Sequence, residues 1–206
     1  YKAEEPITAI TIEYLSGEIL VFACGDYEVQ GNETYIKCKD EWTLCKKFLM
    51  AWEAKCPDVL TGWNTKFFDV PYLVNRFKRI LGDDEALKLS PWKRISERTA
   101  IVKGKAQTVY EILGLSHLDY IELYRWYAPD GKSQESYRLD AIAQSELGEG
   151  KLSYEEYDNL HALYRLNHQK FIEYNIKDVR LILKLEDKLK LIELALTLAY
   201  DTKCNY

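Results

Sequence analysis

Alternating apolar and polar side chains open the chain, in ITAITIEYLSGEILVFAC on both sides of Ser16-Gly17. Period-two alternation around a turn dipeptide is typical of a β-hairpin, so we predict strands near residues 7–14 and 19–24. The period then changes to that of a helix in EWTLCKKFLMAWEAK. This segment predicts a helix near 41–54 whose apolar stripe is formed by Trp42, Cys45, Phe48, Leu49 and Trp52.

The next apolar segment, DVLTGW, is short and predicts a strand. A helix is expected from about Pro71 to Leu81. One face of this helix is apolar and contains Val70, Leu73, Val74, Phe77, Ile80 and Leu81. Asp69 stands just before a first turn that contains proline, a position where aspartate is favoured, so we expect Asp69 to cap the helix.

Two further extended segments follow. The stretch RTAIVKGKAQTVYEIL predicts a second hairpin within residues 94–113, with its turn at Lys103-Gly104-Lys105. The stretch HLDYIELY predicts a strand from His117 to Tyr124.

The last third of the chain is expected to be helical. Ser136 can cap the helix in YRLDAIAQSEL, and Gly148 stands where a glycine would end it. Ser153 and Glu156 form a capping-box pattern for the C-terminal helices within 153–206, which break near Asn167. Strands and helices in this order predict a mixed-sheet α/β fold.

Composition narrows the class of protein. With 206 residues and 47% apolar content, the chain can build one ordinary core, so we expect one domain. No membrane span or signal peptide is predicted. The five cysteines are odd in number and form no C-x-x-C pair, which fits a reduced intracellular protein. The three histidines lack metal-ligand spacing, and we expect structural roles for His117, His161 and His168.

The net charge of -5 argues against a dedicated duplex-DNA binder. It does not exclude an enzyme that holds a nucleic-acid end through metal ions. Asp69 lies where a strand feeds a helix, and open α/β sheets place ligand sites there, so this aspartate could cap, bind a ligand, or do both. A Y-x-x-x-D pair shares one helix face, but the chain contains two such pairs, Tyr154 with Asp158 and Tyr174 with Asp178.

Two motifs together resemble a known family. GWNTKFFDVPYL resembles the second exonuclease motif of family B DNA polymerases, with Asn64, Phe68 and Asp69 in register. HQKFIEYNIKDV resembles their third motif and selects Tyr174 and Asp178. Between them, LSPWKR, LDYIELY and YRLDAIA match the order found in replicative polymerases of large tailed phages.

A further segment, GKLSY, resembles the lysine motif of these enzymes and places Lys151 and Tyr154. A solvated surface lysine is the competing interpretation of Lys151. The segment around Lys103-Gly104-Lys105 matches a hairpin that helps phage polymerases pass the primer strand between their two sites. A surface hairpin without that role is the alternative.

The resemblance implies a 3′→5′ proofreading exonuclease with an RNase H-like fold of the DEDDy type. Such an enzyme hydrolyses the terminal phosphodiester with two divalent metal ions, Mg²⁺ or Mn²⁺. By carry-over, Asp178 binds one ion, Tyr174 orients the attacking water, and Asp69 supports the second ion. Asn64, Phe68 and Tyr154 contact the single-stranded 3′ end, and Lys151 meets a phosphate. The implied location is the cytoplasm of a host cell.

One departure limits this expectation. The family's first motif, D-x-E on the central strand, has only the lookalike TIE, in which Thr11 replaces the aspartate and Glu13 remains. We therefore expect the chain to begin just after that motif, with the central strand absent and a weak or inactive nuclease as the result. It also lacks the polymerase signatures of palm, fingers and thumb. Whether the remaining carboxylates bind an ion is left open.

An absent central strand leaves two sheet edges unpaired. Open edges invite pairing, so we expect either self-association or an N-terminal hairpin, within residues 1–25, displaced into the gap. Two alternatives to a truncated exonuclease remain from the sequence. One is a non-catalytic structural or DNA-binding module of a polymerase, and the other is a free-standing nuclease of the DEDD class.

Overall fold

The computed structural model describes residues 2–102, 104–128, 136–153, 156–157 and 159–204. The chain divides into two compact units, and each is described by itself. Unit 1 contains the described parts of 1–7, 45–128 and 191–206, and unit 2 contains those of 8–44 and 129–190.

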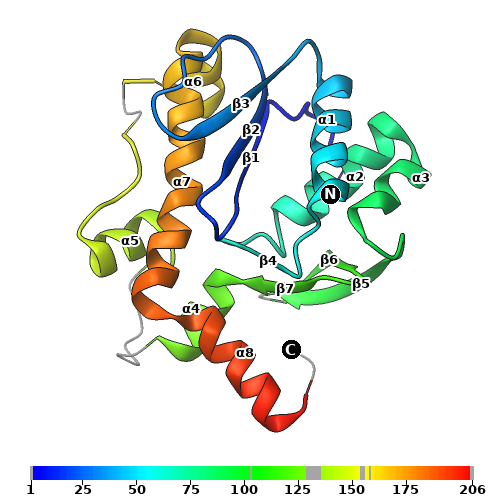
Figure 1. Ribbon diagram of the computed structural model, residues 1–206, viewed down its shortest axis with the longest axis vertical. Helices are drawn as coiled ribbons and strands as arrows, with labels where there is room; N and C mark the ends of the chain where they lie inside the picture. Colours follow the sequence, from blue (N-terminus) through cyan, green and yellow to red (C-terminus); the bar gives the residue numbers. More distant parts are fainter. Residues whose placement is uncertain (1, 103, 129–135, 154–155, 158, 205–206) are drawn as a thin grey trace. The chain divides into compact units, whose positions relative to one another are not determined.

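The sheet of unit 2 has three strands, β1 (Ala9–Glu13), β2 (Ile19–Cys24) and β3 (Glu33–Cys38), in the order β1-β2-β3 (Figure 1). β1 and β2 pair antiparallel, which confirms the first hairpin, and Gly17 supplies the positive φ of +84° in its turn. β2 and β3 pair parallel. β3 was not predicted, although its sequence ETYIKC is rich in residues that favour strands.

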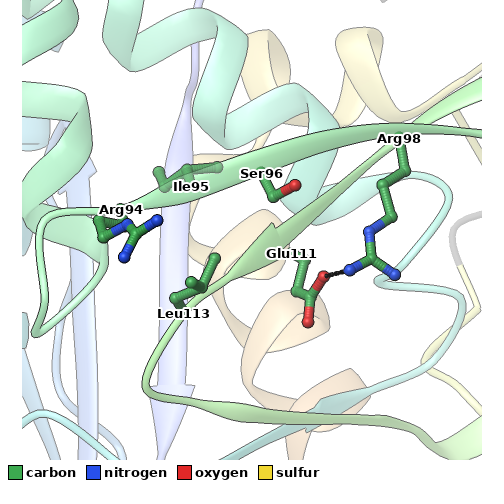
Figure 2. A pocket seen from close by; sticks show the side chains of 6 residues that line it. All are labelled: Arg94, Ile95, Ser96, Arg98, Glu111 and Leu113. Atoms are coloured by element: carbon green, nitrogen blue, oxygen red, sulfur yellow. Dashed lines mark ion pairs between the residues drawn. The ribbon is translucent and has the colours of Figure 1, made fainter.

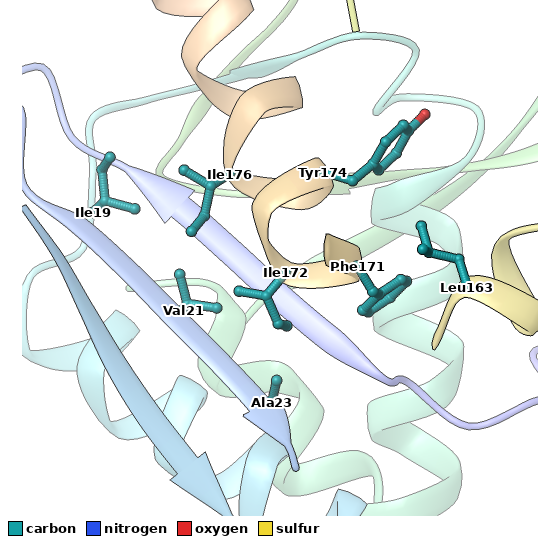
Figure 3. Packing of buried hydrophobic residues seen from close by; sticks show 8 residues of the cluster. All are labelled: Ile19, Val21, Ala23, Leu163, Phe171, Ile172, Tyr174 and Ile176. Carbon is teal, nitrogen blue, oxygen red and sulfur yellow. The ribbon is translucent and has the colours of Figure 1, made fainter. Parts of the chain in front are cut away.

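Three helices complete unit 2: α5 (Leu139–Leu147), α6 (Leu160–Leu166) and α7 (His168–Leu189). α7 packs against β1, α5 and α6 (Figure 1). The core lies between α7 and β2, and Figure 3 shows its buried members, which are Ile19, Val21, Ala23, Leu163, Phe171, Ile172, Tyr174 and Ile176. This core fixes the helix that carries the Y-x-x-x-D pair at Tyr174.

Unit 1 contains a two-stranded parallel sheet and a hairpin. β4 (Val59–Gly62) pairs with β7 (Ser116–Asp119), and Gly62 lies opposite Asp119. The predicted second hairpin is confirmed as β5 (Ile95–Val102) and β6 (Lys105–Ile112). The helical segments are α1 (Glu41–Ala54, which begins in unit 2), α2 (Asp69–Leu81), α3 (Asp83–Ala86), the 3-10 turn η1 (Leu87–Leu89), α4 (Tyr120–Tyr127) and α8 (Leu191–Thr202).

Aromatic packing dominates the core of unit 1. Phe48 stacks on Trp52 at 5.6 Å and meets Phe77 edge-on at 5.8 Å between ring centroids. The Trp52 indole N–H donates to the Leu89 carbonyl at 2.8 Å, which satisfies its one polar group. The predicted stripe of α1 is confirmed except at Trp42, whose side chain is 53% exposed.

Two predictions around the sheet of unit 1 are corrected. The strand expected to reach Tyr124 ends at Asp119, because the Asp119 side chain caps α4 by accepting from the Ile121 amide. The cap of α2 is Phe68 and not Asp69. Asp69 is the first helical residue, where its negative charge still interacts favourably with the helix dipole.

Two helix starts in unit 2 also differ from prediction. The residue before α5 is Arg138, and Ser136 only accepts a hydrogen bond from the Arg138 amide at 3.3 Å. α6 begins at Leu160 behind an Asn159 cap, so the capping-box prediction at Ser153 and Glu156 is wrong.

The predicted helix end at Gly148, with φ of +71°, is confirmed. The break near Asn167 is confirmed too, and Asn167 caps α7.

The mixed α/β class predicted from the sequence is confirmed. Within the parts of the chain that the structure describes, β1 pairs only with β2 and β4 pairs only with β7. Among those same residues, we find no helix with the length and apolar content needed to cross a membrane.

Candidate functional site

A lysine, a tyrosine and an aspartate come together in unit 2. Tyr174 and Asp178 lie four residues apart on α7 and therefore project from one face of the helix. The Lys151 ammonium donates to Asp178 Oδ2 at 2.6 Å and to the Tyr174 hydroxyl at 3.1 Å. It also lies 5.1 Å from the centroid of the Tyr174 ring. Of the two pairs in the sequence, the one at Tyr174 therefore gains a basic partner.

The second oxygen of Asp178 is the unusual atom of this cluster. Asp178 Oδ1 is buried and has no hydrogen-bond partner among the described residues. Burial raises the pKa of Asp178, and the Lys151 ammonium opposes that rise. For Lys151, burial acts to lower the pKa, but the Asp178 carboxylate and the Tyr174 hydroxyl together raise it, and the net shift is upward. The pair is thus held as an ion pair with one carboxylate oxygen left over.

The backbone of Lys151 is held in place by α5. Its amide donates to Asp140 Oδ1 at 2.7 Å. A Cβ on the preceding Gly150 would lie 2.4 Å from the same oxygen, so the close approach requires glycine. Because its side chain is only 26% exposed and its backbone is anchored, Lys151 is not a solvated surface lysine.

The second exonuclease-like motif lies in unit 1, on the loop from β4 into α2. Asn64 has a left-handed φ of +64° and is exposed. Phe68 is 49% exposed and stacks on Tyr72 at 6.3 Å. Asp69 is exposed in the first turn of α2. This loop therefore presents an amide, an aromatic ring and a carboxylate to solvent within a few residues.

The structure accordingly forms two local groups from the predicted site residues. Lys151, Tyr174 and Asp178 meet in unit 2, whereas Asn64, Phe68 and Asp69 follow one another in unit 1. Tyr154, predicted to contact DNA, lies outside the described residues, as does Asp158.

Asp119 was missed by the sequence analysis. The signal that could have found it is an aspartate at the carboxyl end of a short strand, directly before an amphipathic run. Its side chain accepts a hydrogen bond from the Asn64 amide, in the loop that leaves β4.

The segment that resembles a first motif carries polar atoms on a buried face. Thr11 and Glu13 lie opposite Val21 and Ile19 in the β1–β2 register, and so face the core of unit 2. Thr11 Oγ1 and Glu13 Oε2 are buried without a hydrogen-bond partner among the described residues. Burial raises the pKa of Glu13, and the nearby Arg180 opposes the rise.

The donor set fits a divalent metal in part. Asp178 Oδ1 is a hard oxygen that is buried and lacks a partner, as a ligand atom would be. Within the described ranges, however, no group of three or more His, Cys, Asp and Glu side chains is placed to hold an ion. Among the described residues, a complete ligand set is therefore not found.

A surface pocket of about 340 Å³ lies on the β5–β6 hairpin (Figure 2). Arg98 and Glu111 form an ion pair there, so the two charges largely neutralise each other. Arg94 lies at the other end of the pocket, beside Leu113 (Figure 2). A role for this hairpin in passing a primer strand stays a prediction.

Comparison with known proteins identifies the family of the chain. The family model for the exonuclease domain of family B DNA polymerases matches residues 2–142. The chain belongs to this family. The match includes the loop with Asn64 and Asp69, and the lysine, tyrosine and aspartate cluster lies beyond it.

Full-length viral and archaeal polymerases are among the relatives of this family B exonuclease domain. The DNA-directed DNA polymerase of Escherichia phage RB69 is 37% identical over 85% of the chain, and that of Enterobacteria phage T4 is 34% identical over 87%. DNA polymerase 1 of Saccharolobus solfataricus is 32% identical over 89% of the chain. The chain spans only about a fifth of the length of these proteins, 19% to 20%.

Proposed function

We propose that this chain is a 3′→5′ proofreading exonuclease domain with an RNase H-like fold, which acts on the 3′ end of single-stranded DNA. The observation that carries the proposal is the cluster of Lys151, Tyr174 and Asp178. It unites the third exonuclease-like motif with the lysine motif in one unit.

In this proposal each side chain has a separate task. The Tyr174 hydroxyl accepts from the Lys151 ammonium, so its own proton points elsewhere and can orient a water molecule. The Lys151 ammonium is positioned to meet a phosphate oxygen when Asp178 is engaged by another cation. In unit 1, Asn64 and Phe68 contact the terminal nucleotide through hydrogen bonds and base stacking.

Asp178 Oδ1 would hold one Mg²⁺ or Mn²⁺ ion, and Asp69 would support a second ion. When bound, such an ion lowers the pKa of a water molecule and stabilises charge on the scissile phosphate. The described residues lack a complete ligand set, so we propose that this chain alone is a weak or inactive nuclease.

The first test is Mn²⁺ soaked into crystals of the chain and located by anomalous scattering. We expect a peak beside Asp178 in the wild type and none in Asp178→Asn. The matched control is Glu149→Gln, which alters a carboxylate that binds Lys177 and Lys184 instead. No peak at Asp178 in the wild type contradicts the proposal.

The second test follows a labelled single-stranded oligonucleotide with Mg²⁺. We expect little shortening from its 3′ end. Rapid shortening that disappears in Asp178→Ala would show that the site is complete and that the proposed weakness is wrong.

Tight DNA binding without any Mn²⁺ peak would favour the second candidate, a non-catalytic DNA-binding module. The incomplete ligand set is the observation that favours this candidate.

The proposed partners include polymerase palm, fingers and thumb segments, and a second copy of the chain. Self-association is supported by the edges of β1 and β4, each of which pairs on one side only among the described residues. We expect the sedimentation coefficient to rise with protein concentration. A strictly monomeric species over a hundredfold concentration range would contradict this.

A further inference from the structure

The carboxylate of Asp119 is buried against the loop that leaves β4. Asp119 as a whole is 2% exposed. Asp119 Oδ1 accepts from the Asn64 amide at 2.9 Å and from the Ile121 amide at 3.3 Å, and Oδ2 accepts from the Lys66 amide at 2.9 Å. One side chain therefore binds three backbone N–H groups, two of them in the loop.

This arrangement requires a carboxylate. Both oxygens face N–H donors, and a carboxylate is an acceptor at both atoms. An asparagine at position 119 would turn its NH₂ group toward either the Lys66 amide or the Asn64 amide, donor against donor. Burial raises the pKa of Asp119, and the hydrogen bonds from Lys66, Asn64 and Ile121 oppose that rise.

The clamp acts where the loop's backbone is left-handed. Asn64 has a φ of +64°, a region that side-chain-bearing residues rarely adopt. The two loop amides that Asp119 binds belong to Asn64 itself and to Lys66, two residues further on. The clamp therefore holds the backbone on both sides of the left-handed residue's peptide link to Thr65.

The clamped segment continues directly into α2. The Asn64 carbonyl accepts from the Phe68 amide at 3.1 Å, and the Thr65 carbonyl accepts from the Val70 amide at 2.9 Å. These bonds connect the loop to the first turn of α2, and the second of them spans Asp69. The backbone that Asp119 fixes thus sets the directions in which Asn64, Phe68 and Asp69 project.

Neighbouring contacts hold the loop's side chains, whereas Asp119 holds its backbone. The Thr65 hydroxyl lies 2.9 Å from His117 Nε2. The Lys66 ammonium pairs with Glu122 at 2.8 Å. The pair between Lys66 and Glu122 is partly exposed and can be removed separately, which supplies a matched control.

We propose that Asp119 is a positioning residue of the exonuclease site: its carboxylate holds the loop in the conformation that presents Asn64 to the 3′-terminal nucleotide. The inference rests on the proposed function of Asn64. Asp119 itself touches neither DNA nor metal in this role.

The experiment compares Asp119→Asn, Asn64→Ala and the double variant in the 206-residue chain, with Glu122→Gln as control. The probe is a fluorescein-labelled oligothymidylate with a free 3′-hydroxyl, and its Kd is measured by anisotropy. Circular dichroism establishes beforehand that each variant is folded at the temperature used. The backbone amide signals of Asn64 and Lys66 are followed by NMR in parallel.

We expect Asp119→Asn and Asn64→Ala each to weaken binding by about tenfold, and the double variant to be no weaker than either one. Glu122→Gln should weaken binding less than about twofold, as for a partly exposed ion pair. The amide protons of Asn64 and Lys66 should move upfield in Asp119→Asn while hairpin amides stay in place. If Asp119 only stabilised the fold, the losses of binding caused by Asp119→Asn and by Asn64→Ala would add in the double variant. Such additivity would overturn the inference.

The two proposals fail in different ways. If Asn64→Ala binds the oligonucleotide as tightly as the wild type, the proposed function of Asn64 is wrong, and with it the positioning role. If Asn64→Ala weakens binding but Asp119→Asn does not, only the role of Asp119 is overturned. If Asp119→Asn does not fold, hydrogen exchange of the Asn64 and Lys66 amides in the wild type tests the inference instead. Exchange as fast as that of exposed loop amides would overturn it, and slower exchange would support it.

Discussion

His117 makes the stability of unit 1 dependent on pH. Its Nε2 lies 2.9 Å from the Thr65 hydroxyl, on the same loop that Asp119 clamps. Burial, together with a smaller contribution from the nearby Lys66 ammonium, lowers the pKa of His117 to about 4. The folded protein therefore keeps this imidazole neutral over a range in which the unfolded chain protonates it.

The sign and size follow from the two pKa values. An ordinary histidine has a pKa near 6.5. As the pH falls below that value, His117 becomes protonated in the unfolded state but stays neutral in the folded state. Stability is fully present above about pH 6.5 and is lost progressively down to about pH 4. Between about pH 7.5 and about pH 5 the loss attributable to His117 is about 2 kcal/mol, at about 1.4 kcal/mol per unit of pKa difference.

The assay is urea unfolding of the wild type and His117→Gln at both pH values. Glutamine can still bond to Thr65 but does not titrate, and the contributions of all other groups largely cancel between the two proteins. We expect the free energy of unfolding to fall by about 2 kcal/mol more in the wild type than in the variant. Equal pH dependence in the two proteins would refute the reasoning, because it would mean that His117 titrates normally when folded.

Four further substitutions are expected to lower stability, and chemical denaturation is the measurement. Lys151→Met should destabilise by about 1 to 2 kcal/mol, since it leaves Asp178 Oδ2 without its partner, and a cost near zero would show that the pair is solvated. Asn167→Ala removes the cap of α7 and should cost about 1 kcal/mol, whereas no loss would mean that the cap contributes nothing. Gly148→Ala should cost about 1 kcal/mol through its positive φ alone, because a Cβ there meets no atom. Gly25→Ala should cost clearly more, because its Cβ would lie 2.7 Å from the His168 ring, and equal costs would contradict the packing argument.

Local physics explains which elements the sequence could predict. The two hairpins follow from alternation around Gly17 and Gly104, and α1, α2 and α7 follow from their helical period. The prediction failed where a side chain ends an element that the alternation of apolar and polar residues would continue. Asp119 caps α4, so the strand predicted to reach Tyr124 ends at Asp119. β3 was missed because it pairs parallel with β2, so the two strands are not joined by the tight turn that marks a hairpin.

The candidate site divides in the same way. Helical geometry alone places Tyr174 and Asp178 on one face, and motif order alone selects them over the second pair. That Lys151 binds both, and that one Asp178 oxygen stays buried without a partner among the described residues, depends on how segments far apart in the chain pack. The clamp from Asp119 to Asn64 likewise joins residues 55 positions apart. Periodicity and caps are short-range and can be read from neighbours in sequence, whereas hydrogen bonds between distant segments exist only once the core has brought them together.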